Sequence, residues 1–300
     1  MKFINLIEAK SAYQKGDNVK IYLREKFGSA INSSEIIEIV YDLQAGSYID
    51  FANSNRNKAE SHATELAEIL QFHLEDGDSL LDVGTGEITI LTLILNKLDI
   101  NFSDILALDI SWSRLSVGMK FYQENRKIKF PIKPFVADMK EIPLHQKCVD
   151  VITSDHGLEP NGGNLEILLC ELFRVAKKKL VLFEPSYEIN TKKGKARMDK
   201  MGYIKDIKGK VSKLGGKLLD VISIKNIFNP LNPTACYIIE PPRQDIEHIK
   251  TIKFCVPGTS FELKLDGQYL SSRDTGLVFP IIDEIPVLKT SSAILATSKF

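Results

Sequence analysis

The chain has 300 residues, a length that suits one large domain with appendages or two domains. Its hydrophobic content of 44% and charged content of 26% are ordinary for a globular protein. Lys plus Arg and Asp plus Glu each number 39, so the chain as a whole is not a polyanion binder, and this neutral balance disfavours a nucleic-acid partner.

The sequence also predicts the compartment. No apolar run approaches the ~20 residues of a membrane span, and the first eight residues do not resemble a signal peptide. The four cysteines are scattered without a Cys-x-x-Cys pair, which indicates neither a disulfide framework nor a zinc site. We therefore expect a cytoplasmic protein with no membrane partner and no bound metal.

Residues 1–75 carry helical patterns and predict an N-terminal helical cap. One helix is expected over 34–44, where Ser33 and Ser34 are candidate capping residues. A second is expected over 58–74, where Ala59, Ala63 and Leu66 share one face. The segment between these two helices is expected to connect them.

Residues 76–240 predict a single α/β domain. Strands are expected at 79–83, 104–109, 132–137, 148–154, 179–184, about 218–227 and 234–240. Helices are expected at about 87–98, 112–125, 164–176 and 191–202. This alternation predicts a Rossmann-like, doubly wound sheet of seven strands, in which the last two form an antiparallel hairpin because no helix separates them.

The most informative segment is the turn Asp82-Val83-Gly84-Thr85-Gly86-Glu87, after the first strand. Glycines let the backbone approach a ligand closely, and Asp109 ends the next strand at the spacing of a nucleoside-binding unit. A dinucleotide site wants a third glycine, which is missing, and Glu87 would place a negative charge where a pyrophosphate binds. Asp82 suits a ligand that carries an ammonium group instead.

The pattern Asp82-x-Gly84-x-Gly86 resembles the first motif of class I S-adenosylmethionine (SAM) methyltransferases, whose cofactor has a cationic amine and no phosphate. The resemblance implies that Asp109 binds the ribose hydroxyls. It also implies that Asp138 and Met139 bind the adenine. For Trp112, covering the adenine and packing in the core remain equal alternatives. The cofactor-binding residues expected on this basis are Asp82, Gly84, Thr85, Gly86, Asp109, Ile110, Trp112, Asp138, Met139 and Asp155.

The loop after the fourth strand, residues 155–163, is where this family places the methyl acceptor. Methyl transfer from a sulfonium is a direct displacement, so the enzyme mainly aligns the acceptor and excludes water. A hydroxyl acceptor must also lose its proton. His156, with an unperturbed pKa of ~6.5, is the expected general base, and a structural role is its alternative. Glu184, after the fifth strand, is expected as a second base.

Residues 191–217 hold ten basic residues against two acids. They predict either a solvated lysine-rich face or an electropositive rim that attracts an anionic substrate. Arg197 would clamp a carboxylate or phosphate there. Related methyltransferases close an N-terminal segment over SAM, so Tyr48 is either a lid residue or a packing residue of the cap. The expected substrate-binding residues are Tyr48, Glu159, Asn161, Gly162, Tyr187, Arg197 and Asn232.

Residues 241–300 predict a small β-rich module. Residues 240–245 are the expected linker, and short β segments are expected at 253–257, 261–263, 268–271 and 276–288. The run from 269 to 288 resembles the zinc-ribbon-like activator subunits of tRNA and protein methyltransferases, which open with a Cys-Pro-x-Cys knuckle. Here the segment reads Cys255-Val256-Pro257-Gly258, and one thiolate cannot complete a four-ligand site. We therefore expect that this module lacks the metal ligands and has lost the zinc.

Together these resemblances imply a SAM-dependent methyltransferase. The leading interpretation is O-methylation of a small anionic acceptor, such as an acidic or nucleotide-activated sugar, because the acceptor-loop motifs resemble bacterial methyltransferases of surface-polysaccharide biosynthesis. The alternatives are an RNA or protein methyltransferase, suggested by the activator-like module, and a SAM-binding scaffold without catalysis. The sequence does not choose between oxygen and nitrogen as the methylated atom. The exposed β module leaves a homodimer open.

Overall fold

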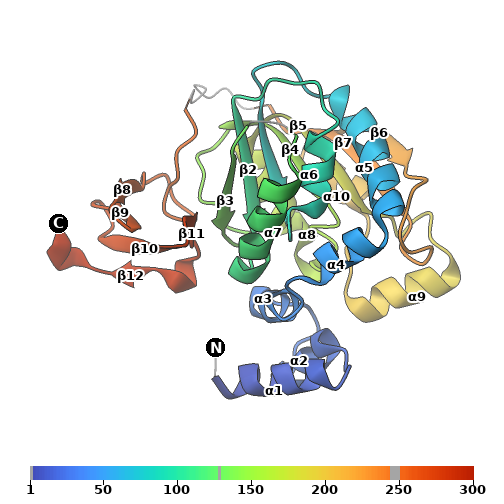
Figure 1. Cartoon of the computed structure of the whole chain (residues 1–300), viewed down its shortest axis with the longest axis horizontal. Coiled ribbons are helices and arrows are strands. Elements are labelled where there is room, and N and C mark those ends of the chain that lie inside the picture. The colour runs from blue at the N-terminus through green and yellow to red at the C-terminus, as the bar shows by residue number, and fades with distance from the viewer. Residues whose placement is uncertain (1–2, 128–129, 244–250) are drawn as a thin grey trace.

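Seven strands form the central sheet in the computed structural model, which describes residues 3–127, 130–243 and 251–300 (Figure 1). Their order is β3-β2-β1-β4-β5-β7-β6, and β7 alone in this sheet runs antiparallel to its neighbours. The predicted α/β class, the seven strands and the terminal antiparallel hairpin are confirmed. The strands are β1 (Ser79–Val83), β2 (Asp104–Asp109), β3 (Ile132–Val136), β4 (Val149–Asp155), β5 (Ala176–Pro185), β6 (Lys217–Ser223) and β7 (Thr234–Glu240).

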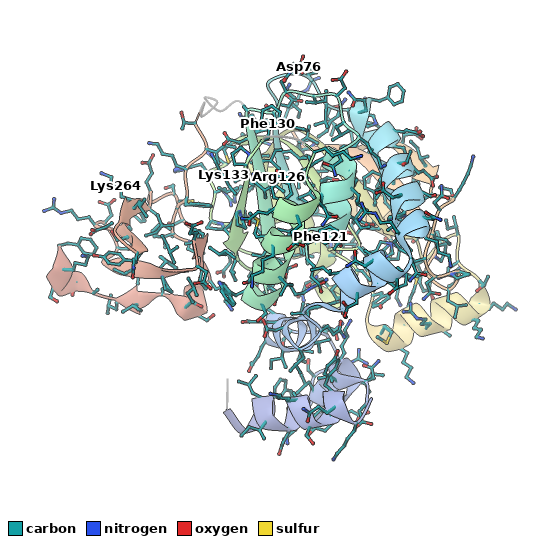
Figure 2. The ribbon with its side chains drawn as sticks, in the orientation of Figure 1. Asp76, Phe121, Arg126, Phe130, Lys133 and Lys264 are labelled. Atoms are coloured by element: carbon teal, nitrogen blue, oxygen red, sulfur yellow. The ribbon has the colours of Figure 1, made fainter. Side chains whose placement is uncertain are left out.

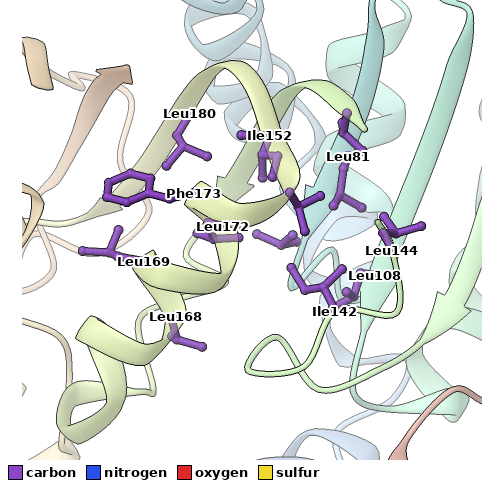
Figure 3. Close-up of a cluster of buried hydrophobic side chains, with 14 of the residues drawn as sticks. Leu81, Leu108, Ile142, Leu144, Ile152, Leu168, Leu169, Leu172, Phe173 and Leu180 are labelled. Carbon is purple, nitrogen blue, oxygen red and sulfur yellow. The ribbon is translucent and has the colours of Figure 1, made fainter. Parts of the chain in front are cut away.

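Helices cover the two faces of this sheet. Helices α5 (Arg56–Gln71), α6 (Thr89–Leu95) and α7 (Trp112–Asn125) pack on one face, and α8 (Leu165–Val175) and α10 (Ile207–Lys213) pack on the other. Successive strand residues point to opposite faces. Leu80 therefore joins the core under α5, whereas Leu81 joins the core under α8 together with Leu168 and Leu172 (Figure 3).

Several boundaries differ from the predicted ones for local reasons. Helix α6 begins at 89 because Ile88 has a left-handed φ of 56°, which is incompatible with a helical turn. Strand β6 ends at 223, since the amides of Lys225 and Asn226 turn away and donate to the Glu65 carboxylate at 2.8 Å each. Between β5 and β6, α9 (Lys192–Met201) was predicted, whereas the short, lysine-rich α10 was not.

Four helices precede α5 and form the cap: α1 (Phe3–Gln14), α2 (Val19–Phe27), α3 (Ser34–Asp42) and α4 (Ser47–Ser54). The first three share a small core of their own that includes Ala9, Leu23 and Ile36. Figure 1 shows α1 and α2 farthest from the sheet, with α3 and α4 between them and the central domain. Ser33 caps α3 as predicted, whereas α4 replaces much of the expected connecting segment. The cap thus places α3 and α4 next to the sheet.

The C-terminal residues form a five-stranded antiparallel module beside β3 (Figure 1). Its edge continues the central sheet, because Val287 pairs with Val136 and the Leu288 amide donates to the Val136 carbonyl at 2.7 Å. The ring of Phe254 packs edge-on against Phe135, with centroids 5.1 Å apart. The strands are β8 (Lys264–Asp266), β9 (Tyr269–Ser272), β10 (Leu277–Ile282), β11 (Ile285–Pro286) and β12 (Ile294–Leu295). The module is thereby attached to the β3 edge of the central sheet.

Two expectations concern the linker and the metal. The expected linker is described only as far as residue 243, so its second half lies outside the described residues. Cys255 is fully buried with a free thiol. Residues 3–127, 130–243 and 251–300 contain no group of three or more potential metal ligands. Figure 2 shows exposed Lys264 on the module, apart from Phe121 of α7 and from Arg126, which follows that helix. In the same ranges no helix is both long and apolar enough to cross a membrane.

Candidate functional site

The carboxyl ends of β1 and β4 border a cavity of about 500 Å³. These two strands are adjacent, and the chain runs outward from them in opposite directions along the sheet, so the cavity lies where an open α/β sheet binds its ligand. Its size is within the range of small-molecule sites. The predicted residues that line it are Tyr48, Asp82, Gly84, Thr85, Gly86, Asp109, Ile110, Asp138, Met139, Asp155, His156, Glu159, Asn161, Arg197 and Asn232.

Two backbone segments cross at the floor of this cavity, and both require glycine. A Cβ on Gly157 would lie 2.2 Å from the Val83 carbonyl oxygen, and a Cβ on Gly84 would lie 2.5 Å from the Gly157 Cα. Gly84 also has a φ of +69°, which disfavours other residues. The glycine turn therefore packs against the loop of residues 155–163, here called the acceptor loop.

Asp109 holds the glycine turn in place. Its Oδ2 accepts from the Gly86 amide and its Oδ1 from the Ser111 amide, both at 2.9 Å. A carboxylate retains further lone pairs for a ligand hydroxyl. The buried Thr85 Oγ1 and Asp155 Oδ1 also line the cavity and make no hydrogen bond within the described residues. The residues thus fit a ligand with ribose hydroxyls and donor groups, as the expected cofactor has.

Arg114, which the sequence analysis did not identify, connects the cap to the glycine turn. Arg114 is buried between the rings of Tyr41 and Tyr48, at 5.2 and 4.4 Å from their centroids, and its Nε lies 3.6 Å from the Glu87 carboxylate. The other Glu87 oxygen accepts from the Ile49 amide of α4 at 2.8 Å. Glu87 therefore does not project an uncompensated charge toward the ligand. Tyr48 both lines the cavity and packs within the cap.

His156 lies at the centre of a polar network in the acceptor loop. Its Nδ1 is 2.8 Å from the Glu159 carboxylate and its Nε2 is 2.8 Å from the Thr234 hydroxyl, while Asn232 donates to the same carboxylate. Burial by itself lowers the pKa of His156, but the Glu159 hydrogen bond and charge outweigh it and raise the pKa to about 9. An imidazolium cannot accept a proton, so this pKa disfavours the role of general base, which stays a prediction.

A second buried histidine was missed by the sequence reasoning. His62 of α5 lines the cavity with its Nδ1 2.7 Å from the Asn226 carbonyl and its Nε2 3.2 Å from the Asp155 carboxylate. Burial lowers the pKa of His62, but Asp155 outweighs it and raises the pKa; His62 in turn keeps the pKa of Asp155 below its usual range. The available clue was its position on the same buried face as Ala59 and Ala63.

The structure does not bring four predicted site residues to the cavity wall. The Trp112 indole donates to the Ile282 carbonyl of the C-terminal module at 3.2 Å. Glu184 is fully buried behind the acceptor loop, where it accepts from the Ser154 hydroxyl and the Leu158 amide, and burial raises its pKa to about 7. The Gly162 amide donates to the Gly202 carbonyl, and Tyr187 donates to an aspartate of α9. These contacts support the site from outside.

The opposite part of the cavity wall is basic. Arg197 lines it, and its Nη1 is buried without a hydrogen bond in the described part of the chain. Lys20 of α2, also missed, is buried behind this wall with its ammonium 5.3 Å from the rings of Tyr41 and Tyr203. Burial lowers the pKa of Lys20 to about 8. Much of the predicted basic segment does not face the cavity, since Lys210 and Lys213 pair with a glutamate of α8.

Comparison with known proteins agrees with this geometry. Residues 81–183 match the family model of the methyltransferase domain, whereas no curated protein matches the sequence. A chain of a Haloferax volcanii complex between the Trm112 methyltransferase activator and a methyltransferase is 13% identical, with a TM-score of 0.52, over 67% of this chain and 98% of that one. The magnesium protoporphyrin IX methyltransferase of Synechocystis is 12% identical, with a TM-score of 0.52, over 69% and 98%. At these identities the likeness shows the fold alone.

The sheet order and the cavity at its centre define the central domain as a Rossmann-like nucleoside-binding domain of class I methyltransferase architecture. The matched segment contains the glycine turn, Asp109, Asp138 and the acceptor loop, so this is a SAM-dependent methyltransferase domain. Its cofactor is SAM, which supplies an electrophilic methyl group when bound. The zinc-ribbon resemblance of the C-terminal module finds no such support.

Proposed function

We propose that this protein is a SAM-dependent O-methyltransferase of a small anionic acceptor, such as an acidic or nucleotide-activated sugar used for a bacterial surface polysaccharide. The observation that carries the proposal is Arg197, whose guanidinium lines the cavity while its buried Nη1 lacks a hydrogen-bond partner among the described residues. Buried polar groups are almost always paired. A guanidinium is suited to a carboxylate or phosphate, which it binds with two parallel hydrogen bonds.

The distribution of charge supports the same proposal. The glycine-turn end of the cavity carries Asp82, Asp109 and Asp155, which suits the cationic methionine part of SAM. Burial among these carboxylates raises the pKa of Asp82 to about 8, so a bound cation would stabilise its ionised form. The other end carries Arg197, which suits an anion, and His156, whose pKa the paired Glu159 raises to about 9. The cavity thus has complementary ends for the two reactants.

The cap supports catalysis by enclosing the reactants. Ser34 and Tyr41 of α3 and Tyr48 and Phe51 of α4 line the cavity opposite the strand ends. Enclosure excludes water and holds the acceptor in line with the methyl group, which is most of what a displacement requires. The hydrogen bond from the Ile49 amide to Glu87 connects this closed position to the cofactor-binding turn. Closure and cofactor binding are therefore expected to support one another.

The proposal is tested with methyl-labelled SAM and four acceptors: glucuronic acid, UDP-glucuronic acid, UDP-glucose and glucose, together with the small-molecule fraction of a bacterial extract. Label is expected on anionic molecules and not on glucose. Arg197→Gln should raise KM about 10- to 100-fold, as loss of a charge-assisted hydrogen bond predicts, and leave the SAM dissociation constant within about 2-fold. The matched control is Lys200→Gln, an exposed residue of the same helix. Label only in RNA or protein would contradict the proposal.

A further inference from the structure

The acceptor end of the cavity contains no strong base among the described lining residues. Transfer to a hydroxyl needs such a group, because the oxygen must lose its proton. The two histidines of the cavity are the natural candidates. The neighbours of His62 are a carbonyl and a carboxylate, so both of its ring nitrogens donate. The Nδ1 of His156 faces the Glu159 carboxylate and its Nε2 is occupied by Thr234.

The carboxylates next to the two histidines are stabilised in their ionised form. Glu159 receives hydrogen bonds from His156, Asn232 and Tyr203, which together outweigh burial and keep its pKa below the usual range. Asp155 pairs through its Oδ2 with the His62 imidazolium, and its Oδ1 makes no hydrogen bond within the described residues; the pairing outweighs burial and keeps the pKa of Asp155 below its usual range. A carboxylate stabilised in this way is a weak base. Neither group is suited to remove a proton from an alcohol.

Like Asp155, the remaining acids belong to the cofactor half of the cavity. Asp109 is bound to two backbone amides, Glu87 to the Ile49 amide, and Asp138 to the Lys140 amide. Asp82 lies near the end of β1, directly before the glycine turn. The positions of these four acids suit them to stabilise the glycine turn and to bind SAM. In the acceptor half the described lining carboxylate is Glu159, which is paired with His156.

Two tyrosines at the acceptor end are donors as well. Burial raises the pKa of Tyr41 and of Tyr203, so both keep their protons at neutral pH. Tyr203 lies against the Arg197 guanidinium, 5.3 Å from it, and directs its hydroxyl to Glu159. The acceptor end therefore offers hydrogen-bond donors and positive charge, and it lacks a base among the described residues.

We infer that the methylated atom is a carboxylate oxygen and that the product is a methyl ester. This inference rests on the proposed function and names its substrate class: a small carboxylic acid whose ionised group is itself the nucleophile. A carboxylate lone pair forms the O–CH₃ bond as the S–CH₃ bond of SAM breaks, and that electron pair stays on sulfur. The atoms balance with no proton transferred, so a site without a base suffices. Arg197 can bind one carboxylate oxygen while the other attacks.

The linkage formed is tested directly on the wild-type enzyme. The protein is incubated with methyl-labelled SAM and either glucuronic acid, galacturonic acid or the small-molecule fraction of a bacterial extract. The purified labelled product is then treated with mild alkali. A methyl ester releases its label as volatile methanol, whereas a methyl ether retains it. We expect full release.

The three outcomes separate the two proposals. Alkali-labile label on a small acid supports the inference. Alkali-stable label on a small anion overturns the inference and leaves the proposed function intact. Label confined to macromolecules, or no label in any fraction while SAM still binds, overturns the proposed function and the inference with it.

A kinetic test on His156→Gln distinguishes a charge-providing role from a base. If His156 only supplies charge to a carboxylate, KM should rise about 10-fold while kcat stays within about 3-fold. If it removes a proton, kcat should fall by about 10²- to 10⁴-fold, which would overturn the inference. Lys200→Gln again serves as the matched control on an exposed position. Because the alkali test uses the wild-type protein, the inference stays testable even where the variant folds poorly.

Discussion

Replacing Glu159 by Gln should lower the pKa of His156, and this is the sharpest test of the site. Glu159 Oε2 lies 2.8 Å from the His156 Nδ1, and this contact is the main reason why the pKa rises to about 9. The difference from an ordinary value of ~6.5 corresponds to about 3 kcal/mol of preference for the charged ring. Glutamine retains a hydrogen-bond acceptor and removes the charge. Asp155 and Glu184 also face the ring and raise its pKa, so some elevation should remain. We expect a value below about 8 in the variant.

The measurement is an NMR titration of the histidine Cε1 protons. The chain has five histidines, and His156→Gln identifies the resonance of interest. Glu166→Gln is the matched control, since it removes a carboxylate whose partners are Lys210 and Lys213 of α10. In that control His156 should titrate as in the wild type. A wild-type His156 that titrates near 6.5 would refute the reasoning, return it to the role of general base and remove the basis for a carboxylate acceptor.

The same pair predicts how stability depends on pH. The folded pKa of His156 is raised, so its contribution is full below about 6.5 and is lost as the pH rises through about 9. The folded pKa of Glu159 is lowered from 4.5, so its contribution is full above about 4.5 and is lost as the pH falls through the folded value. The deficit of Glu159→Gln relative to wild type should therefore be larger at pH 6 than at pH 10, as measured by urea unfolding.

Three further changes test other parts of the structure. Asp109→Ala should weaken SAM binding by about 1–3 kcal/mol in calorimetry, because two buried amides lose their acceptor as well as the ribose; unchanged affinity would contradict the cofactor site. Gly157→Ala should destabilise the fold by about 1–3 kcal/mol in urea, because its Cβ would meet the Val83 carbonyl at 2.2 Å. Leu288→Ala, at a fully buried position, should cost about 2–5 kcal/mol if the module shares its core with the central domain; a module that melts separately without affecting the sheet would argue otherwise.

The strands, the glycine turn and Asp109 were predictable from the sequence. Each depends on a local pattern: buried apolar runs, glycines at a turn and an acid at a strand end. Helix 112–125 was predicted to the residue for the same reason, since Ser111 caps it locally. The position of the cavity also followed, because a doubly wound sheet brings its strand ends together. These features depend on neighbours in the chain.

Tertiary structure alone decided which side chains face the cavity and which carry charge. The Glu159 carboxylate raises the pKa of His156, and Thr234, 78 residues away in the sequence, contacts its other ring nitrogen. The Trp112 indole donates to the Ile282 carbonyl of the C-terminal module, 170 residues away in the sequence, and so does not line the cavity. Arg114 lines the cavity because two tyrosines of the cap enclose its guanidinium. A side chain's direction and pKa are set by the groups packed against it, and those groups come together only when distant parts of the chain fold onto one another.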